Sequence, residues 1–447
     1  MASKSKYILL GLLFWAFCGN AQYGFQKVYN HHKIDTLSIL TDIYVLNDSI
    51  YFSGGGRTGN SYGLRFAKVD EVTGELESLM RYDIEDHAQR AFFSRVDTDT
   101  NFRGNLVNLY RSYNLDFTKN GYRLIEYDLD GDIVFDSLYE TWENDSISIF
   151  DGTYLLQNEE DSSYILLMKY IDYKENGTGN NLSGTLIIKT KYDGEILWRK
   201  TIDITIQDNL IGTGGNNIEK RPEGGYNLHY REVRNGAENL GNYWSKQHFA
   251  VLDDTGNVVS DKVFQDGVYC YTFSEAFFDE DTIYLQYYDS KLYNEGQNNA
   301  AYKAKPVLAK IGPDMEIIWK NELQDFWGNN PGLSGSMKRI RKVNDTSFVG
   351  ARKHSNLISD SITASPLIYT LPVRLYNFTS NGDYNWIRDY YYYPIDSIKD
   401  PSYEINDIEI MPDGGFVLGG ESRLKDSLNQ GKPGQFAYLL RTNCIGF

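Results

Sequence analysis

Two short turn signatures alternate along the whole chain, at a spacing of roughly 60 residues. The first signature lies between two apolar runs and is rich in Asn, Asp and Gly, which favour hairpin turns. Its copies are Asn47-Asp48-Ser49, residues 98–101, Glu160-Asp161-Ser162, Pro222-Glu223-Gly224, Glu280-Asp281-Thr282, Asn344-Asp345-Thr346 and Pro412-Asp413-Gly414. A period of this length is typical of a four-stranded propeller blade with one long loop.

The second signature follows a third apolar run in each unit and leads into a fourth. Its copies begin at Thr73, Asp130, Asp193, Thr255, Asp314 and Asn381, and the last copy is Ile445-Gly446. The sequence stops at Phe447, directly after that turn. The seventh unit, from residue 405 onward, therefore has three apolar runs and lacks the fourth.

The fourth run of each unit has a regular register. The position four residues after each turn glycine, or after Met315 which replaces it, is occupied by Ser78, Phe135, Trp198, Ser260, Trp319 and Trp386. Four residues further on, every side chain is apolar or aromatic: Tyr82, Tyr139, Ile202, Phe264, Leu323 and Tyr390. Phe25 and Tyr29 have the same spacing, so we predict that residues 23–30 supply the missing strand and remove two unpaired sheet edges.

The repeat predicts an all-β fold, and the composition of 40 Gly, 36 Tyr and only 10 Pro is consistent with it. We predict a single domain, residues 22–447, folded as a seven-bladed β-propeller. Its blades are four-stranded, and the N-terminal strand closes the last one. The alternatives are a pair of β-sandwiches or an open solenoid, but a sandwich would not explain the split seventh unit.

Residues 1–21 predict a secretory signal peptide. Lys4 and Lys6 precede an apolar segment, residues 7–18, that is too short to span a membrane. Gly19-Asn20-Ala21 then offers a small-x-small cleavage site, which would make Gln22 the first mature residue. No later stretch has the length of a transmembrane helix. We therefore expect an exported protein, either periplasmic or extracellular at the cell surface.

The three cysteines raise two further questions. A lipoprotein would be anchored at Cys18, but Phe17 is bulky where that processing needs a small residue. Cys270 and Cys444 remain after export, where an oxidising compartment would permit a disulfide. The blade pattern places them on opposite faces and two units apart, so we predict that they are not bonded to each other.

The charge of the chain limits its partners. The formal net charge is -17, and so acidic a protein repels nucleic acid and anionic membranes. The simplest role for the acidic residues is to keep an exported protein soluble, and we prefer this interpretation. We therefore expect a protein or glycan partner.

Loop length distinguishes the two faces of the predicted ring. If the strands of a blade are called A to D, the A–B and C–D turns are tight. The B–C connections (235–247, 292–305, 356–371, 425–435) and the D–A connections (203–215, 324–336, 391–403) are long and emerge on one face. We predict that this long-loop face binds the partner through Trp244, Tyr271, Tyr293, Trp327, Tyr391, Tyr392 and Tyr393, since exposed Tyr and Trp anchor sugars and proteins. The alternative is that these rings pack against their own loops.

Charged residues recur in the innermost A strands. Aligned on the first turn, Asp42, Arg339 and Asp407 are equivalent, as are Arg341 and Glu409, and isoleucines alternate with them. Arg339 and Arg341 would then neighbour Asp407 and Glu409 on the next blade. This favours an ion-paired channel wall, and a ligand site at the channel mouth is the alternative.

No motif indicates a metal or a cofactor. Residues 59–63 match G-x-S-x-G but lie between two predicted strands, not at a strand-to-helix turn. Asp128, Asp130 and Asp132 resemble a calcium loop that lacks its distal Glu. A catalytic acid and base could still be gathered from different blades.

The repeats at 407–422 (DIEIMPDGGFVLGGES), 189–202 (KTKYDGEILWRKTI) and 377–390 (NFTSNGDYNWIRDY) resemble those of secreted bacterial β-propeller proteins, especially ones exported through the type IX pathway. They are more distantly similar to quinoprotein-type blades. The resemblance spans essentially the whole mature chain and implies the fold, but it implies no quinone cofactor because no ligand set matches. Many such proteins carry a C-terminal sorting domain. We expect either that this protein stays in the periplasm or outer-membrane complex, or that such a domain is missing from this sequence.

These observations lead to two functional expectations. The first is an exported, non-enzymatic binding or scaffold protein, an adhesion, surface or assembly component that recognises a protein or glycan through its long-loop face. The alternative is a carbohydrate-active hydrolase or lyase with acidic residues at the channel mouth.

Overall fold

The structure is a computed structural model that describes 17 segments of the chain, and these contain all the strands discussed below. They are residues 24–29, 37–47, 49–58, 61–82, 87–91, 103–114, 120–140, 147–172, 182–202, 210–235, 243–264, 275–289, 305–323, 337–353, 373–390, 402–425 and 433–443. The predicted signal peptide, Cys270 and Cys444 lie outside them, as does the predicted turn at 98–101.

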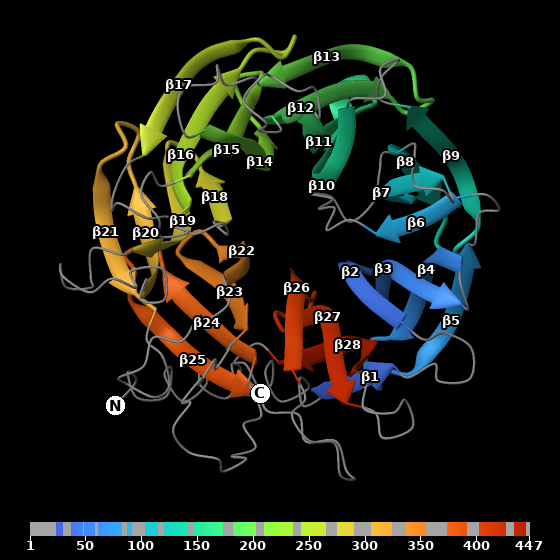
Figure 1. The fold of residues 1–447 in the computed structure, drawn as a ribbon. Coiled ribbons are helices and arrows are strands. Elements are labelled where there is room, and N and C mark those ends of the chain that lie inside the picture. Colours follow the sequence, from blue (N-terminus) through green and yellow to red (C-terminus); the bar gives the residue numbers. More distant parts are fainter. Residues whose placement is uncertain are drawn as a thin grey trace, which may run out of the picture.

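Seven four-stranded antiparallel blades form a ring around a central axis (Figure 1). Blade 1 contains β2 (Leu37–Leu46), β3 (Ser49–Thr58), β4 (Ser61–Asp70) and β5 (Leu76–Tyr82). Blade 2 contains β6 (His87–Ala91), β7 (Leu106–Asn114), β8 (Asn120–Tyr127) and β9 (Ile133–Glu140). Blade 3 contains β10 (Ile147–Asn158), β11 (Ser163–Asp172), β12 (Leu182–Lys191) and β13 (Ile196–Ile202), with the 3-10 helix η1 (Glu159–Asp161) in its first turn.

The remaining blades repeat the same order from the axis to the rim. Blade 4 contains β14 (Leu210–Lys220), β15 (Tyr226–Asn235), β16 (Tyr243–Leu252) and β17 (Val258–Phe264). Blade 5 contains β18 (Glu275–Asp279), β19 (Thr282–Asp289), β20 (Lys305–Ile311) and β21 (Ile317–Glu322). Blade 6 contains β22 (Met337–Asn344), β23 (Ser347–Lys353), β24 (Val373–Thr379) and β25 (Tyr384–Tyr390). Blade 7 contains β26 (Ser402–Ile410), β27 (Phe416–Lys425), β28 (Pro433–Thr442) and β1 (Phe25–Tyr29).

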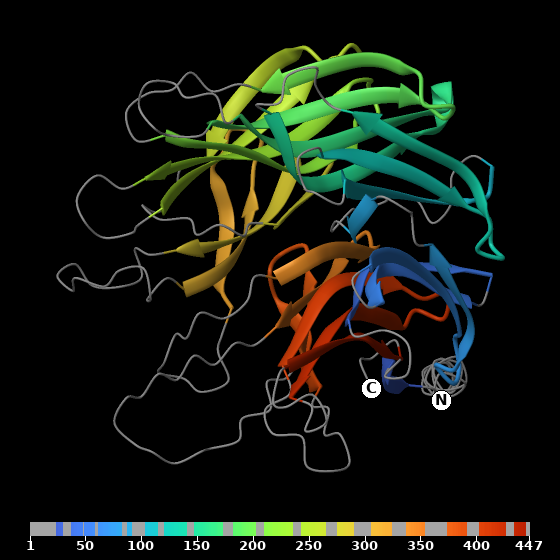
Figure 2. The same ribbon diagram turned by 45° about the vertical axis from the view of Figure 1, so that its right-hand side comes forward.

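Strand β1 closes the ring in the register that the other blades use. It pairs antiparallel with β28, and Phe25 lies opposite Arg441. In blade 3 the equivalent Trp198 lies opposite Lys189, which is five residues before the turn glycine. Arg441 is likewise five residues before Gly446 in the sequence. The seven-bladed fold and its closure by the N-terminal strand are therefore confirmed, and blade 7 lies beside blade 1 (Figures 1 and 2).

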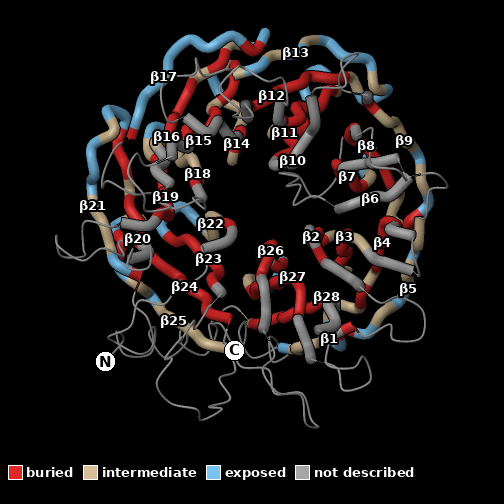
Figure 3. Tube along the Cα trace, viewed as in Figure 1, coloured by how far each residue is buried: buried red, intermediate tan, exposed pale blue. Residues whose placement is uncertain are grey.

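Burial follows the position of a strand within its blade. Every side chain of β24 from Val373 to Phe378 is buried, whereas every side chain of β17 from Val258 to Val263 is exposed. The inner and middle strands are covered on both faces by the neighbouring blades, while the outermost strands border solvent (Figure 3). The core is therefore a series of apolar layers between blades, which stabilises the ring by burying apolar surface.

Several strands extend into regions that the sequence assigns to loops, and β14 and β16 do so by the most residues. β14 begins at Leu210 and β16 at Tyr243, inside the predicted connections 203–215 and 235–247. The glycine-rich start of β14 pairs with β15 through two register shifts, one after Leu210 and one after Gly215. Glycine favours such bulges, so a segment typical of a loop continues the sheet.

Candidate functional site: the ion-paired channel wall

The innermost strands of blades 6, 7 and 1 bring five charged side chains together at the axis. Each of β22, β26 and β2 has a register shift beside its charged residue. In β22 the extra residue is Arg339, which has a φ of 42°. A bulge of this kind redirects a side chain out of the regular alternation, and here it accompanies the contacts that Arg339 makes with two other blades.

Arg339 is the centre of the cluster. Its Nη2 lies 2.8 Å from Oδ1 of Asp42 in blade 1, and its Nε lies 2.9 Å from Oδ1 of Asp407 in blade 7. All three side chains are buried, with side-chain exposures of 3%, 1% and 0%. Asp407 also accepts the backbone N–H of Ile43 through Oδ2 at 2.9 Å. One guanidinium therefore links three consecutive blades.

The outer part of the wall is less buried. Arg341 forms an ion pair with Glu409, and its Nη2 lies 3.9 Å from Oδ1 of Asp407. The side chains of Arg341 and Glu409 are 20% and 17% exposed. Arg341 also donates through Nε to the backbone oxygen of Ile408 at 3.1 Å. The residues predicted for the channel wall thus lie together, and Asp42 joins them from the far side of blade 7.

The protonation of the two buried carboxyl groups differs. Burial raises the pKa of Asp42 well above its ordinary value and outweighs the attraction of Arg339. Burial also acts on Asp407, but the charge of Arg339 and a hydrogen bond with Asp42 outweigh it and lower the pKa. A proton on Asp42 leaves two guanidinium groups facing two carboxylates. The buried cluster is then electrically neutral, which is the arrangement with the smallest desolvation cost.

Neutral hydrogen bonds continue the wall on both sides. The Tyr44 hydroxyl lies 3.0 Å from Oδ2 of Asp42 and 2.6 Å from Oδ1 of Asn108 in blade 2. Asn217 in blade 4 donates through Nδ2 to the backbone oxygen of Ala276 in blade 5 at 2.9 Å. Sequence alignment of the A strands does not reveal the Asn108 contact, because Asn108 belongs to a second strand, β7. The ion pairs and hydrogen bonds of the channel wall therefore connect neighbouring blades.

The aromatic residues predicted for the long-loop face are placed differently. Tyr271, Tyr293, Trp327, Tyr391, Tyr392 and Tyr393 lie outside the described residues. Trp244 belongs to β16 and lies opposite Arg234, next to the last residue pair of the β15–β16 hairpin. The sequence predicts Trp244 in a loop, and the longer strand pair explains the difference.

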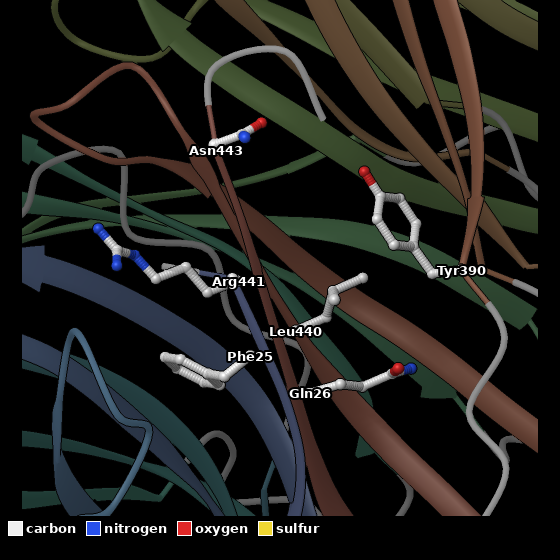
Figure 4. A pocket seen from close by; sticks show the side chains of 7 residues that line it. Phe25, Gln26, Tyr390, Leu440, Arg441 and Asn443 are labelled. Atoms are coloured by element: carbon white, nitrogen blue, oxygen red, sulfur yellow. The ribbon is translucent and has the colours of Figure 1, made fainter. Parts of the chain in front are cut away.

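A hollow of about 570 Å³ lies where β1 meets β28. Phe25 and Arg441 project to one side of this strand pair, whereas Gln26 and Leu440 project to the other, toward Tyr390 of blade 6 (Figure 4). Gln26 donates to the Tyr438 hydroxyl at 2.6 Å, and Arg441 donates to Asp413 at 2.9 Å. Gln26 therefore takes part in closing the ring, and Arg441 is engaged within blade 7.

Two features are absent from the part of the chain that the structure describes, a metal-binding group of side chains and a helix that could span a membrane. Its His, Cys, Asp and Glu side chains form no group of three or more that could hold a metal ion. No helix within the same segments is long and apolar enough to cross a membrane.

The sequence matches no family model, and no match was found among curated proteins. The fold is similar to solved structures at very low identity. A polysaccharide lyase, Uly1, is 11% identical with a TM-score of 0.49, covering 90% of each chain. An α-L-arabinofuranosidase of Fusarium graminearum is 9% identical with a TM-score of 0.42, covering 94% of this chain and 98% of its own. The β-propeller domain of the Trilobed protease from Pyrococcus furiosus is 9% identical with a TM-score of 0.43, covering 90% and 94%.

Proposed function

We propose that this protein is an exported, non-enzymatic binding or scaffold protein that recognises a protein or glycan through its long-loop face. The burial of the central carboxyl groups supports this proposal. Asp42 and Asp407 contact Arg339 and are almost completely inaccessible. A glycoside hydrolase needs two carboxyl groups that reach the scissile bond, and these two are committed to joining blades.

The long connections between strands lie on one face of the ring, and we propose that a partner contacts this face. β2 and β3 are separated by residues 47–48 on one face, whereas β23 and β24 are separated by residues 354–372 on the other. Long loops on a rigid scaffold commonly carry binding residues. We assign partner contact to Trp327, Tyr391 and Tyr392, together with Trp244, Tyr271, Tyr293 and Tyr393.

The export part of the proposal depends on residues 1–21. Their basic start, apolar segment and small-residue cleavage site support cleavage after Ala21. Delivery to the periplasm or cell surface, with the type IX pathway as one route, follows from the resemblance of the repeats. Exported protein should begin at Gln22 on N-terminal sequencing, and retention of residues 1–21 would contradict the proposal.

The test of binding uses residues 22–447 in a glycan array and a pull-down, with every retained glycan checked for turnover. Alanine at Trp327, Tyr391 and Tyr392 together should weaken capture at least about tenfold. Tyr192→Ala is the matched control, because Tyr192 is exposed in a C–D turn on the opposite face. Unchanged capture by the triple variant, with the control also unchanged, would remove the long-loop face from consideration.

A carbohydrate-active hydrolase or lyase is the second candidate. Glu409 and Arg341 are partly exposed, so a substrate could reach this end of the channel wall. Turnover of a retained glycan that is lost in Glu409→Gln would replace the binding proposal by this one. Binding without turnover would support the recognition role.

A further inference from the structure

Most of the described junctions between neighbouring blades have the same contact at the outer rim of the ring. An aromatic ring on the outermost strand of one blade covers the C–D turn glycine of the next blade. The pairs are Phe25 on Gly74, Phe135 on Gly194, Trp198 on Gly256 and Trp319 on Gly382. A Cβ atom at Gly256 would lie 2.7 Å from the Trp198 ring, and Gly256 has a φ of 80°. A ring in this position therefore requires glycine at the turn, because the ring occupies the space of a Cβ atom.

The two tryptophans show how this slot satisfies an indole. Trp198 donates its Nε1 hydrogen to the backbone oxygen of Asp254 at 3.1 Å, and Trp319 donates to Ser380 at 2.9 Å. Each acceptor lies two residues before the turn glycine. The slot thus provides an apolar floor and one carbonyl placed for an N–H donor.

The junction of blades 4 and 5 departs from this contact on both sides. Ser260 of β17 occupies the position of the aromatic ring, and Met315 occupies the position of the turn glycine. Met315 keeps the left-handed backbone of the turn, with a φ of 64°. Its side chain packs against the apolar cluster between blades 4 and 5, but Ser260 offers no ring to cover the turn.

A pocket of about 300 Å³ occupies this junction, on the face of the tight turns. Phe249, Phe278, Ile283 and Met315 provide its apolar lining, and Ser260 lines it from β17. The Phe249 and Phe278 rings lie 6.1 Å apart at 85°, an edge-to-face arrangement. Pro313, which is two residues before Met315, also lines the pocket, and its backbone oxygen accepts Lys262 Nζ at 2.6 Å. The acceptor that receives an indole N–H at two other junctions is therefore present here.

The mouth of the pocket is acidic. Glu223, Glu280 and Asp281 are exposed there, and Asp314 lies beside Lys262. Arg221 pairs with Glu223, so four carboxylates face two cations. Negative potential around an apolar pocket favours a ligand that carries positive charge next to its apolar part.

We propose that the pocket between blades 4 and 5 binds an aromatic side chain, with tryptophan fitting best, from a partner protein segment in which lysine or arginine flanks the ring. The bound ring would lie in the pocket against Phe249, Phe278 and Met315. It would lie beside the turn and not directly over it, because Met315 has a Cβ atom where the other turns have glycine. Its indole N–H would be directed at the Pro313 oxygen, with Lys262 displaced. This site is separate from the long-loop face and does not depend on the function proposed for it.

The test uses residues 22–447 and the peptide Gly-Lys-Trp-Lys-Gly with 5-fluorotryptophan, followed by fluorine NMR. Saturable binding is expected, and the peptide with Glu in place of both Lys residues should bind about tenfold more weakly. The variant Ser260→Trp with Met315→Gly restores the usual ring and glycine, so it should fold and lose binding at least tenfold. Absence of saturable binding to the natural protein, or equal binding by the filled variant, would overturn the proposal.

Two further variants keep the test decisive. Ser78→Trp places the same ring at the equivalent position of blade 1, where Met80 already covers Gly131, and it should leave binding unchanged. Glu280→Lys with Asp281→Lys changes only exposed side chains, so folding should persist while affinity falls about tenfold. Loss of binding in Ser78→Trp, or no loss in the charge-reversed variant, would contradict the assigned pocket.

Discussion

The seam between blades 7 and 1 and the junction between blades 4 and 5 join neighbouring blades in contrasting ways. At the seam the rim is complete: Phe25 covers Gly74, and the Tyr29 hydroxyl donates to the Gly74 oxygen at 2.9 Å. The centre is complete as well, because Asn406 donates to the Leu40 oxygen at 2.7 Å and the Ile43 backbone N–H donates to Asp407 Oδ2 at 2.9 Å. Between blades 4 and 5 the central contact among the described residues is an amide, from Asn217, and the rim is hollow.

The two pairs of blades also differ in how they are connected. Blades 4 and 5 are joined by the chain through residues 265–274, and β1 is joined to blade 1 in the same way through residues 30–36. Blade 7 differs because β1 is separated from its neighbour β28 by nearly the whole sequence, and only non-covalent contacts hold these two strands together. Closure of the ring therefore depends on the β1–β28 pairing and on the side-chain contacts around it.

The largest test of this contrast is deletion of residues 23–30. The deletion exposes the edge of β28 and removes the packing of Phe25 and Tyr29, each worth about 1.5–3 kcal/mol. The urea unfolding midpoint should therefore fall sharply relative to residues 22–447. Lys27→Ala is the control, since its ion pair with Glu75 is exposed and worth less than ~1 kcal/mol. An unchanged midpoint on deletion would mean that β1 does not hold the ring.

The second test compares the centres of the two regions. Arg339→Met leaves the Asp407 carboxylate buried without the cation that contacts it and removes the link to Asp42, and it should cost about 3–5 kcal/mol at neutral pH. Asn217→Ala at the junction of blades 4 and 5 removes one hydrogen bond and should cost about 1–2 kcal/mol. Equilibrium unfolding of both variants gives the comparison. Equal losses would show that the seam is not specially reinforced.

The third and smallest test separates the two acids by their response to pH. The pKa of Asp42 is raised on folding by burial, so its contribution is complete below about pH 4 and declines as the pH rises. Asp42→Asn removes that decline, and its stability relative to the natural protein should rise from pH 4 to pH 8. The pKa of Asp407 is lowered, chiefly by Arg339 acting against burial, so its contribution exists above about pH 4 and is lost below it.

Asp407→Asn should accordingly be most destabilising at neutral pH and least so near pH 3. Urea midpoints of both variants, measured from pH 3 to pH 8, check the signs. If the two variants followed the same trend with pH, the single proton assigned to Asp42 would be placed on the wrong group.

The repeat itself makes the fold accessible from the sequence. The turns need Asn, Asp or Gly for backbone reasons, so they remain visible while the strands vary. The spacing of Phe25 and Tyr29 identifies the closing strand because its side chains fill the same positions as Trp198 and Ile202 in blade 3. Strand ends are less accessible, since glycine at the start of β14 permits both a loop and a bulged strand.

The candidate sites show a different limit. Alignment of the A strands places Arg339 next to Asp407. Its contact with Asp42 depends on a bulge and a left-handed backbone at Arg339. No residue pattern in the sequence predicts these two backbone features. Ser260 and Met315 are both visible in the sequence as departures from the repeat. That they face each other across one junction becomes apparent only in the ring, because they belong to different blades.

The pairing of β1 with β28 also determines when the ring can exist. Gln26 and Tyr438 touch although 412 residues separate them. Such separation adds little to the free-energy cost of closure, which grows only logarithmically, but contacts this distant in sequence form slowly. A chain made or exported from its N-terminus presents β1 first and must keep it unpaired until residues 433–442 arrive. The β1–β28 pairing therefore cannot form before residues 433–442 are present, and until the two strands pair, Phe25 and the edge of β28 are open to mispairing.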